Sequence, residues 1–170
     1  MIYVLFGPPG VGKTYVGELV SKSLGIKFLD ADSLYEAEEV RLLQEGAYNQ
    51  TDRDHFFKKL MDKIGSIVDK DNKNLIVAAA FTKEKNRLEF VDHFSNQICY
   101  IRVDTPREVA IKRARERLKK STHTINEIAL ELIWREFDAP RFLHMQLVND
   151  GLTDKELVFE FTRLIQLIEN

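Results

Sequence analysis

Short runs of apolar residues recur along the chain, and between them lie longer segments with apolar residues every three or four positions. The first run, Ile2 to Phe6, is continuous and stops at Gly7, as is typical of a strand buried on both faces. Similar runs follow after each longer segment. We predict strands at residues 2–6, 26–29, 75–80, 97–103 and 145–148.

The segments between these runs have the periodicity of amphipathic helices. Phe56, Leu60 and Ile64, for example, fall on one side of a helix. Gly25 is placed to end the first helix, and Pro106 lies in the first turn of a later one. We predict helices at residues 13–24, 33–44, 52–68, 83–94, 105–120 and 125–137, with a last one from about 157 to 168.

Short strands that alternate with helices indicate an α/β fold, in which a parallel sheet is covered by helices on both faces. The 170 residues contain no linker, repeat or low-complexity segment, and this length suits one domain with a proper core. We therefore predict a single domain over residues 1–170.

Composition narrows the classes of partner. The net charge of −2 argues against a general nucleic-acid or anionic-membrane surface, so we expect neither partner. Cys99 is the single cysteine, which excludes an intrachain disulfide and favours a reducing, cytoplasmic location. An apolar run that starts at residue 2 without a basic leader predicts no signal peptide and no membrane span.

The segment GPPGVGKT, residues 7–14, matches the phosphate-binding pattern G-x-x-x-x-G-K-[ST]. It lies where that chemistry requires, after the first strand and at the start of the first helix, which argues against a chance match. Lys13 is expected to span the β- and γ-phosphates, and Thr14 to supply an oxygen to Mg²⁺. The residues predicted to bind the nucleotide here are Gly7, Pro8, Pro9, Gly10, Val11, Gly12, Lys13, Thr14 and Tyr15.

The strand LIVAAAF, residues 75–81, ends without the aspartate that often helps to hold magnesium beside such a loop. Two carboxylates follow a neighbouring strand instead, in the sequence Asp30-Ala31-Asp32. The carboxyl ends of parallel strands meet at one edge of the sheet, where ligands bind. If strand geometry continues, Asp30 and Asp32 share a direction. The alternative interpretation is a turn or a helix cap, which aspartates often supply.

This order of motifs resembles the gluconate kinase and shikimate kinase group of P-loop small-molecule kinases, over nearly the whole chain. The resemblance rests on the phosphate loop, the strand that ends in D-x-D, the pair Asp52-Arg53 and the strand that ends in small residues. It implies a three-layer α/β/α P-loop kinase fold. The five-stranded parallel sheet would have the order 2-3-1-4-5, and a helical lid would lie at about residues 113–126.

The resemblance also implies roles for individual residues. Asp30 would lie with Thr14 on the Mg²⁺ side, and Asp32 would hold and activate the acceptor hydroxyl. Arg113 would lie beside the adenine and Arg117 in the lid. The residues that would carry catalysis are Lys13, Asp32 and Arg117. The residues that would contact the acceptor are Asp32, Arg53, Ala78, Ala79, Ala80 and Arg135.

The sequence departs from the gluconate kinase pattern around the acceptor. The gluconate kinase pattern has His-Pro where this sequence has Tyr35 and Glu36. It has a Ser-Gln pair where this sequence has Leu132 and Ile133. The phosphoryl-transfer residues therefore match more closely than those of the acceptor pocket.

Several arginines admit more than one interpretation. Arg53 either binds a carboxylate bidentately or is a solvated helix residue. Arg135 is a candidate for a second anion contact. The cations at one helix end are expected to close as a lid over the phosphates, although a solvated helix face or a nucleic-acid patch would have the same charge. They are Arg113, Arg115, Arg117, Lys119 and Lys120, and His123 is the one histidine in this predicted lid.

These patterns favour an ATP- and Mg²⁺-dependent kinase that phosphorylates a hydroxyl of a small, anionic metabolite, acting as a monomer or homodimer. A nucleoside or nucleotide kinase is one alternative, since it would share the loop and the lid. A nucleotide-driven switch is another, although residues 72–75 do not complete the guanine-binding pattern N-K-x-D.

Overall fold

A computed structural model describes residues 1–71, 74–120 and 125–169, and in this part of the chain five parallel strands form one sheet. The strands are β1 (Ile2–Phe6), β2 (Lys27–Asp30), β3 (Leu75–Ala79), β4 (Ile98–Asp104) and β5 (Met145–Val148). Their order is β2-β3-β1-β4-β5, so the predicted order and the α/β class are confirmed.

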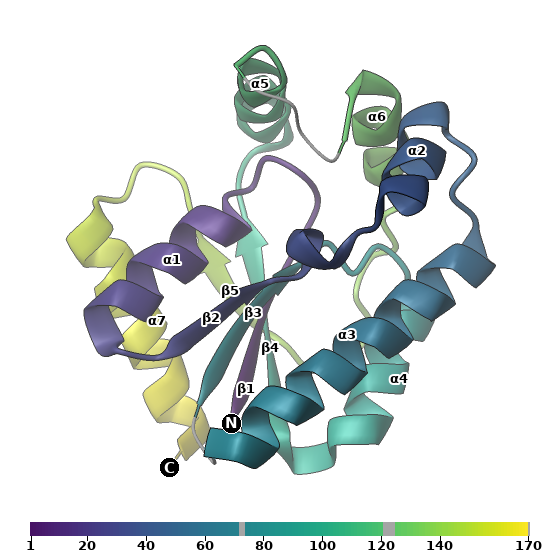
Figure 1. Cartoon of the computed structure of the whole chain (residues 1–170). Helices are drawn as coiled ribbons and strands as arrows, with labels where there is room; N and C mark the ends of the chain where they lie inside the picture. The colour runs from purple at the N-terminus through teal and green to yellow at the C-terminus, as the bar shows by residue number, and fades with distance from the viewer. Residues whose placement is uncertain (72–73, 121–124, 170) are drawn as a thin grey trace.

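Helices cover both faces of this sheet (Figure 1). The α-helices are α1 (Lys13–Leu24), α2 (Ala37–Glu45), α3 (Gln50–Asp71), α4 (Glu84–Phe94), α5 (Arg107–Leu118), α6 (Glu127–Glu136) and α7 (Asp154–Glu169), and the 3₁₀ helices are η1 (Ala31–Leu34) and η2 (Ser95–Gln97). α1 and α7 lie on one face, and α3 and α4 on the other. α2, α5 and α6 stand above the carboxyl ends of the strands (Figure 1). None of the described helices is both long and apolar enough to cross a membrane.

The central strand β1 supplies both halves of the core, because successive side chains of a strand point to opposite faces. Val4 and Phe6 belong to the cluster beneath α3 and α4, whereas Tyr3 and Leu5 belong to the cluster beneath α1 and α7. All four are fully buried. The continuous apolar run at residues 2–6 is thus explained by burial on both faces.

The predicted helix at residues 33–44 is wrong in its first part. After β2 the chain forms the short helix η1, and α2 begins only at Ala37. Asp30 causes the early turn, since its carboxylate accepts a hydrogen bond from the backbone N–H of Asp32 (3.0 Å). Pro106 also differs from the prediction, because it lies one residue before α5 rather than inside its first turn. Residues 121–124 of the expected lid, including His123, lie outside the described residues.

A buried arginine fixes the chain where β3 ends. Phe81 has a φ of 47°, a left-handed conformation that is strained for a bulky residue. The Arg87 guanidinium is fully buried, and it donates to the carbonyls of Phe81 (2.8 Å), Thr82 (3.2 Å) and Asp138 (2.8 Å). It also donates to the Glu84 carboxylate (2.7 Å). These bonds hold the residues after β3 against the segment that follows α6.

Replacing Arg87 by methionine is expected to destabilise the fold by about 3–5 kcal/mol, because it removes one hydrogen-bond donor each from the Glu84 carboxylate and from three backbone carbonyls. Urea unfolding followed by circular dichroism measures the change. Arg41→Met is the matched control, since Arg41 also has glutamate partners but is about half exposed, and its loss is expected to cost less than about 1 kcal/mol. Equal losses in the two variants would contradict the structural role of Arg87.

Candidate active site

The phosphate loop depends on glycines at two positions. Gly10 and Gly12 have φ angles of 89° and 95°, which other residues rarely adopt. A Cβ at Gly10 would lie 1.9 Å from the carbonyl oxygen of Ala110, and one at Gly12 would lie 2.1 Å from Nδ2 of Asn149. α1 starts at Lys13, directly after this loop. The unpaired N–H groups and the dipole of that helix end favour a bound anion.

Three side chains from distant segments hold the loop in place. The carbonyl of Val11 accepts hydrogen bonds from Thr105 Oγ1 (3.1 Å) and from Asn149 Nδ2 (2.7 Å). Trp134 Nε1 donates to the carbonyl of Pro9 (3.2 Å). The sequence analysis did not identify these anchors. A signal was present for Asn149, which directly follows a predicted strand, and for Thr105, which comes two residues after another, at the edge where ligands bind.

One cavity brings together most of the predicted phosphoryl-transfer residues. Those that line it are Pro9, Gly10, Gly12, Lys13, Thr14, Asp30, Asp32, Ala78, Ala79, Ala80 and Arg117. Its other walls are mostly apolar, and include Tyr35, Leu43 and Ile133. The strand LIVAAAF therefore forms part of the cavity wall, although it carries no acid.

The remaining predicted residues lie elsewhere. Gly7 is not among the lining residues of this cavity, while Pro8 and Val11 face a separate hollow beside Trp134. Tyr15 and Arg113 line a neighbouring hollow together with Asn149 and Leu152. Gly10 and Gly12 also line that hollow, so it adjoins the phosphate loop. Arg113, which was expected to lie beside the adenine, is thus next to the loop.

Thr14 and Asp30 form a pair of hard oxygen donors. Thr14 Oγ1 donates to Asp30 Oδ2 (2.9 Å), although the two residues belong to different elements. In the described residues, no group of three or more Asp, Glu, His or Cys side chains is placed to hold a metal by itself. A hydroxyl and one carboxylate suit Mg²⁺, which takes oxygen ligands and usually keeps waters and substrate phosphates as the others. The pair therefore fits a magnesium site that is completed by a bound nucleotide.

Asp32 lies on the same side of the cavity, although not by continued strand geometry. Its backbone is in η1, and its side chain remains accessible from the cavity. Desolvation by the surrounding walls of the cavity, and then the neighbouring Asp30, raise the pKa of Asp32 above its ordinary value, while Lys13 and Arg117 oppose the rise. A carboxylate with a raised pKa is a better proton acceptor.

The pKa of Lys13 is shifted in the opposite direction, below its ordinary value. Its ammonium donates to the carbonyl of Pro8 (3.0 Å). Burial lowers its pKa to about 8, and the nearby Arg117 adds to the effect, while Asp32 and Asp30 oppose it. The surrounding protein therefore disfavours the charged form of Lys13, and phosphates bound beside it would favour that form.

Nucleotide affinity is expected to fall as the pH rises through about 8, because phosphates bind the protonated form of Lys13. Calorimetric titration with ATP in EDTA should show binding about 20-fold weaker at pH 9.5 than at pH 7.5. Lys13→Arg is the control, since a guanidinium stays charged over this range. An equal slope in both proteins would assign the pH dependence to another group.

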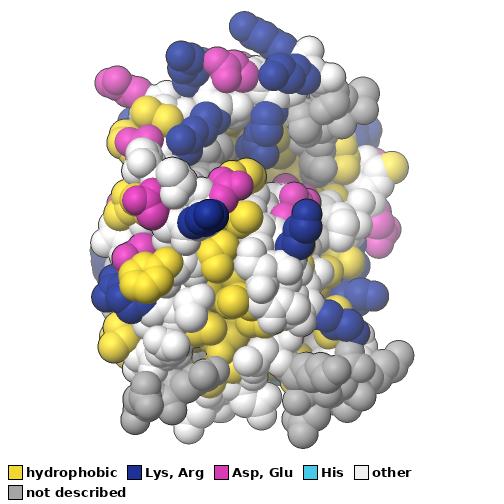
Figure 2. Space-filling view, turned by 90° about the vertical axis from the view of Figure 1, so that its left-hand side faces the viewer, with side chains coloured by type: hydrophobic (Ala, Val, Ile, Leu, Met, Phe, Trp, Pro, Cys, Tyr) yellow, Lys and Arg dark blue, Asp and Glu magenta, His cyan; other side chains and the backbone are white. Residues whose placement is uncertain are grey.

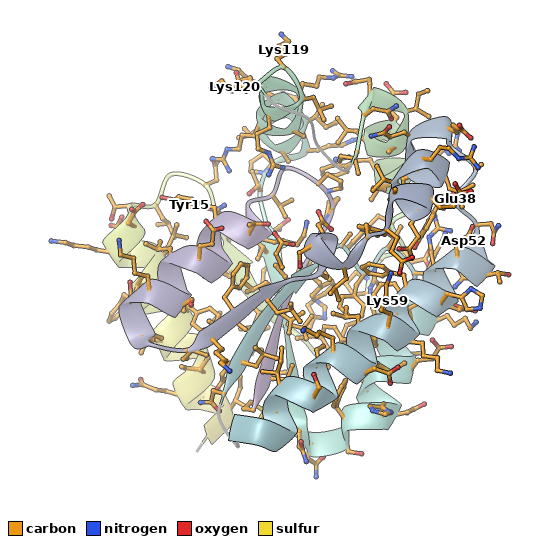
Figure 3. All side chains as sticks on the ribbon, in the orientation of Figure 1. Tyr15, Glu38, Asp52, Lys59, Lys119 and Lys120 are labelled. Atoms are coloured by element: carbon orange, nitrogen blue, oxygen red, sulfur yellow. The ribbon has the colours of Figure 1, made fainter. Side chains whose placement is uncertain are left out.

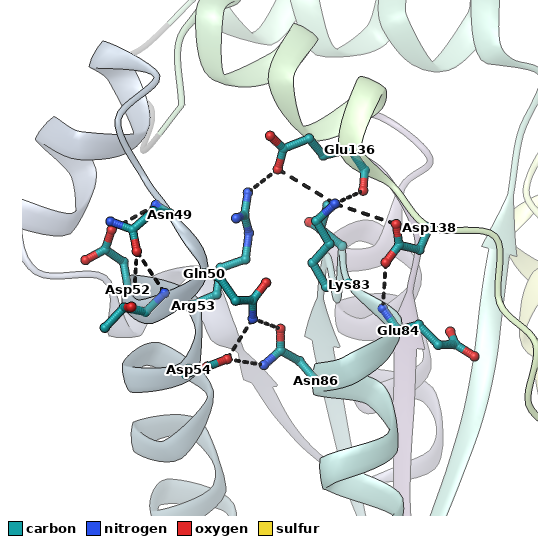
Figure 4. A network of polar contacts seen from close by, with 12 residues as sticks. Asn49, Gln50, Asp52, Arg53, Asp54, Lys83, Glu84, Asn86, Glu136 and Asp138 are labelled. Atoms are coloured by element: carbon teal, nitrogen blue, oxygen red, sulfur yellow. Dashed lines mark hydrogen bonds and ion pairs between the residues drawn. The ribbon is translucent and has the colours of Figure 1, made fainter.

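Arg53 is not solvated, and its guanidinium is already paired with a carboxylate of the protein. It is 7% exposed, and its Nη2 lies 2.6 Å from Glu136 Oε2. Figure 4 shows this pair within a polar network that joins α3, the start of α4 and the end of α6. Asp52 points away from it, because its carboxylate accepts from the backbone N–H of Asn49 (2.8 Å). Arg135 is exposed and lines none of the cavities described here, so the structure does not bring it to the acceptor side.

The cations of α5 have different surroundings. Arg117 lines the main cavity, whereas Arg113 donates to the carbonyl of Asn149 (3.0 Å) and Arg115 to Glu127 (2.6 Å). Lys119 and Lys120 lie at the outer end of the helix (Figure 3). Figure 2 shows basic side chains gathered around a hollow at this end of the molecule. Of the α5 cations, Arg117 is thus the one that lines the main cavity.

Known proteins with similar sequences and folds are kinases. A shikimate kinase from Bacillus licheniformis is 33% identical over 97 residues, which are 53% of this chain and 51% of that protein, so this match spans about half of each. A shikimate kinase from Clostridium botulinum is 27% identical over 95% of this chain and 94% of its own length. The crystal structure of a gluconokinase from Sinorhizobium meliloti 1021 superposes with a TM-score of 0.77 at 20% identity, and the match covers 99% of this chain and 93% of that one. The structural match supports the fold.

A family model described as an AAA domain matches residues 2–140, which include the phosphate loop, both aspartates and the strand LIVAAAF. Because this model covers more than half of the 170 residues, the chain belongs to the AAA domain family, and the resemblance to the gluconate kinase and shikimate kinase group predicted from its motifs is confirmed.

Proposed function

We propose that this protein transfers the γ-phosphoryl group of ATP to a hydroxyl of a small molecule. The observation that carries the proposal is the meeting of Lys13, the Thr14–Asp30 pair and Asp32 in one cavity at the carboxyl edge of the sheet. A cation, two metal-suited oxygens and a carboxylate of raised pKa are the groups that phosphoryl transfer to an alcohol requires.

Each group has a distinct task in this proposal. Lys13 holds the β- and γ-phosphates, and Arg117 stabilises the charge on the transferring group. Asp32 accepts the proton of the acceptor hydroxyl, while the oxygen of that hydroxyl forms a bond to the γ-phosphorus and the bond between the γ-phosphorus and ADP breaks. Thr14 and Asp30 would hold Mg²⁺, which would neutralise phosphate charge. α5, which carries Arg117, acts as part of a lid that excludes water.

The names of the relatives support a hydroxylated small molecule as the acceptor, since shikimate and gluconate both carry hydroxyl groups. The anionic character that the sequence analysis attached to the acceptor came from the resemblance to gluconate and shikimate kinases, and from Arg53 and Arg135 as candidate anion contacts. Arg53 is ion-paired with Glu136 and Arg135 is exposed, so the proposed function retains the hydroxyl and not the negative charge.

A screen of ADP release tests the proposal against its alternatives. Sugar acids, shikimate, neutral alcohols, sugars and nucleosides are offered with ATP and Mg²⁺, and ADP is measured by a coupled assay. We expect release that depends on one class of acceptor, with the phosphorylated product detected by mass spectrometry. Stimulation by nucleosides alone would favour a nucleoside kinase, and ATP hydrolysis that no acceptor increases would favour a nucleotide-driven switch.

A further inference from the structure

Aromatic rings gather beside the main cavity. An adjoining cavity is lined by the rings of Tyr35, Tyr48, Phe56, Phe57 and Phe81. Tyr35 stacks on Phe56 with ring centroids 4.1 Å apart, and Phe57 stacks on Phe81 at 4.6 Å. Tyr35 follows η1, Tyr48 lies between α2 and α3, Phe56 and Phe57 lie on α3, and Phe81 follows β3, so tertiary packing assembles these rings.

This aromatic cavity continues the phosphoryl-transfer site. Asp32, Tyr35, Ala79 and Ala80 line both cavities, and so does Ile133. A molecule whose hydroxyl reached Asp32 would therefore place its body against the alanine methyls and the nearest rings. This is the space that an acceptor occupies in the proposed function.

The charges on this side are already compensated. Arg53 is the cation among the described residues that line the aromatic cavity, and it is paired with Glu136 at 2.6 Å and lies over the Tyr48 ring. Lys83, the next cation, lies 4.0 Å from Glu136 and 3.6 Å from Asp138 (Figure 4). Arg53 and Lys83 thus face two carboxylates. Asp32 adds a negative charge, which Lys13 and Arg117 face from the phosphate side of the main cavity.

A carboxylate would enter such a site at a disadvantage. It would lose its hydration, face the charge of Asp32 and compete with Glu136 for Arg53. The phenols add no charge to this site, because burial raises the pKa of Tyr35 and Tyr48 and keeps both in their neutral form. Apolar and aromatic surface would be buried favourably against the rings.

We propose that the acceptor is an uncharged alcohol with an apolar or aromatic body. Its hydroxyl lies at Asp32 and its body packs against Tyr35, Ala79, Ala80 and Ile133. The inference rests on the proposed function and specifies the class of its substrate. Glu136 acts as the specificity-determining residue, since it neutralises the arginine that would otherwise attract an anion.

Two probes of equal shape and different charge test this inference. 4-(Hydroxymethyl)benzamide and 4-(hydroxymethyl)benzoate are titrated into the full chain with Mg²⁺ and a non-hydrolysable ATP analogue, and binding is followed by ligand-detected NMR. The amide is expected to bind at least about tenfold more tightly than the carboxylate. Equal or tighter binding of the carboxylate overturns the inference, and so does the absence of saturable binding by the amide.

Glu136→Gln tests the cause of the preference. This variant keeps the shape of the side chain and unmasks Arg53, so the carboxylate probe is expected to gain at least about tenfold relative to the amide. Glu131→Gln is the matched control on the same helix, since Glu131 is exposed near Arg115, and its probe preference should equal that of the wild type. An unchanged preference in Glu136→Gln would overturn the assigned role of Glu136.

Two further measurements keep the test decisive. If Glu136→Gln melts far below the wild type, the double variant Arg53→Gln/Glu136→Gln removes both charges, and it is expected to retain the preference for the amide. Loss of that preference overturns the inference. The proposed function fails in a different way, since then no alcohol of either charge would stimulate ADP release that depends on Lys13.

Discussion

Replacing Asp32 by asparagine is expected to lower kcat by about 10²–10⁴-fold, because the amide cannot accept the proton of the acceptor hydroxyl. ATP affinity should be unchanged or tighter, since the variant removes a negative charge from the cavity that receives the phosphates. The measurement is acceptor-dependent ADP release, combined with calorimetric binding of ATP. A variant that transferred phosphate at the wild-type rate would exclude Asp32 as the base.

The acid limb of the pH profile gives a second readout for Asp32. Since the pKa of this carboxyl is raised, lowering the pH should begin to reduce the wild-type kcat at a pH above the ordinary pKa of aspartate. The residual activity of Asp32→Asn should not show this decrease. Its raised pKa also means that the folded protein disfavours the ionised form. The variant should therefore melt no lower than the wild type at pH 7. Glu38→Gln is the control, because Glu38 is an exposed carboxylate on α2 (Figure 3) whose loss should leave kcat unchanged.

Replacing Lys13 by alanine is expected to lower kcat/KM by about 10²–10³-fold and to weaken ATP binding, because the cavity loses the cation placed for the phosphates. Coupled ADP release and calorimetry measure the two effects. Lys22→Ala is the matched control, since Lys22 is an exposed lysine in the last turn of the same helix. If Lys13→Ala kept full affinity and turnover, the phosphate-loop interpretation would be overturned.

The lowered pKa of Lys13 also predicts how the stability of the fold depends on pH. Its folded pKa of about 8 lies below the ordinary value of 10.5, so the folded protein disfavours the protonated form. This penalty is complete below pH 8 and disappears as the pH rises towards 10.5. Thermal melts should show that the wild type gains stability over that window relative to Lys13→Ala.

The elements of this fold were largely predictable because their signals are local. The residues of β1, α1 and β5 agree with the sequence-based prediction at both ends. Each is either a continuous apolar run or a periodic segment between clear boundaries, so neighbouring residues suffice to define it. The region after β2 was predicted less well, because the hydrogen bond from Asp32 to Asp30 creates η1 where the apolar pattern favoured a longer helix.

The residues proposed for phosphoryl transfer were also predictable from local sequence. The loop at residues 7–14 is contiguous, and Asp30 and Asp32 follow a strand whose end must lie near it in a parallel sheet. The sequence by itself thus determined the α/β class, the phosphate loop and the two carboxylates beside it.

Only the tertiary structure decided the character of the acceptor side. Arg53 and Glu136 are 83 residues apart, and neither sequence neighbourhood indicates that the two side chains meet at 2.6 Å. The same holds for Trp134, which contacts Pro9 across 125 residues, and for the rings that line the aromatic cavity. The charge that a pocket presents is the sum over groups brought together by packing. The same arginine therefore attracts an anion when it is unpaired and is neutralised when a glutamate faces it.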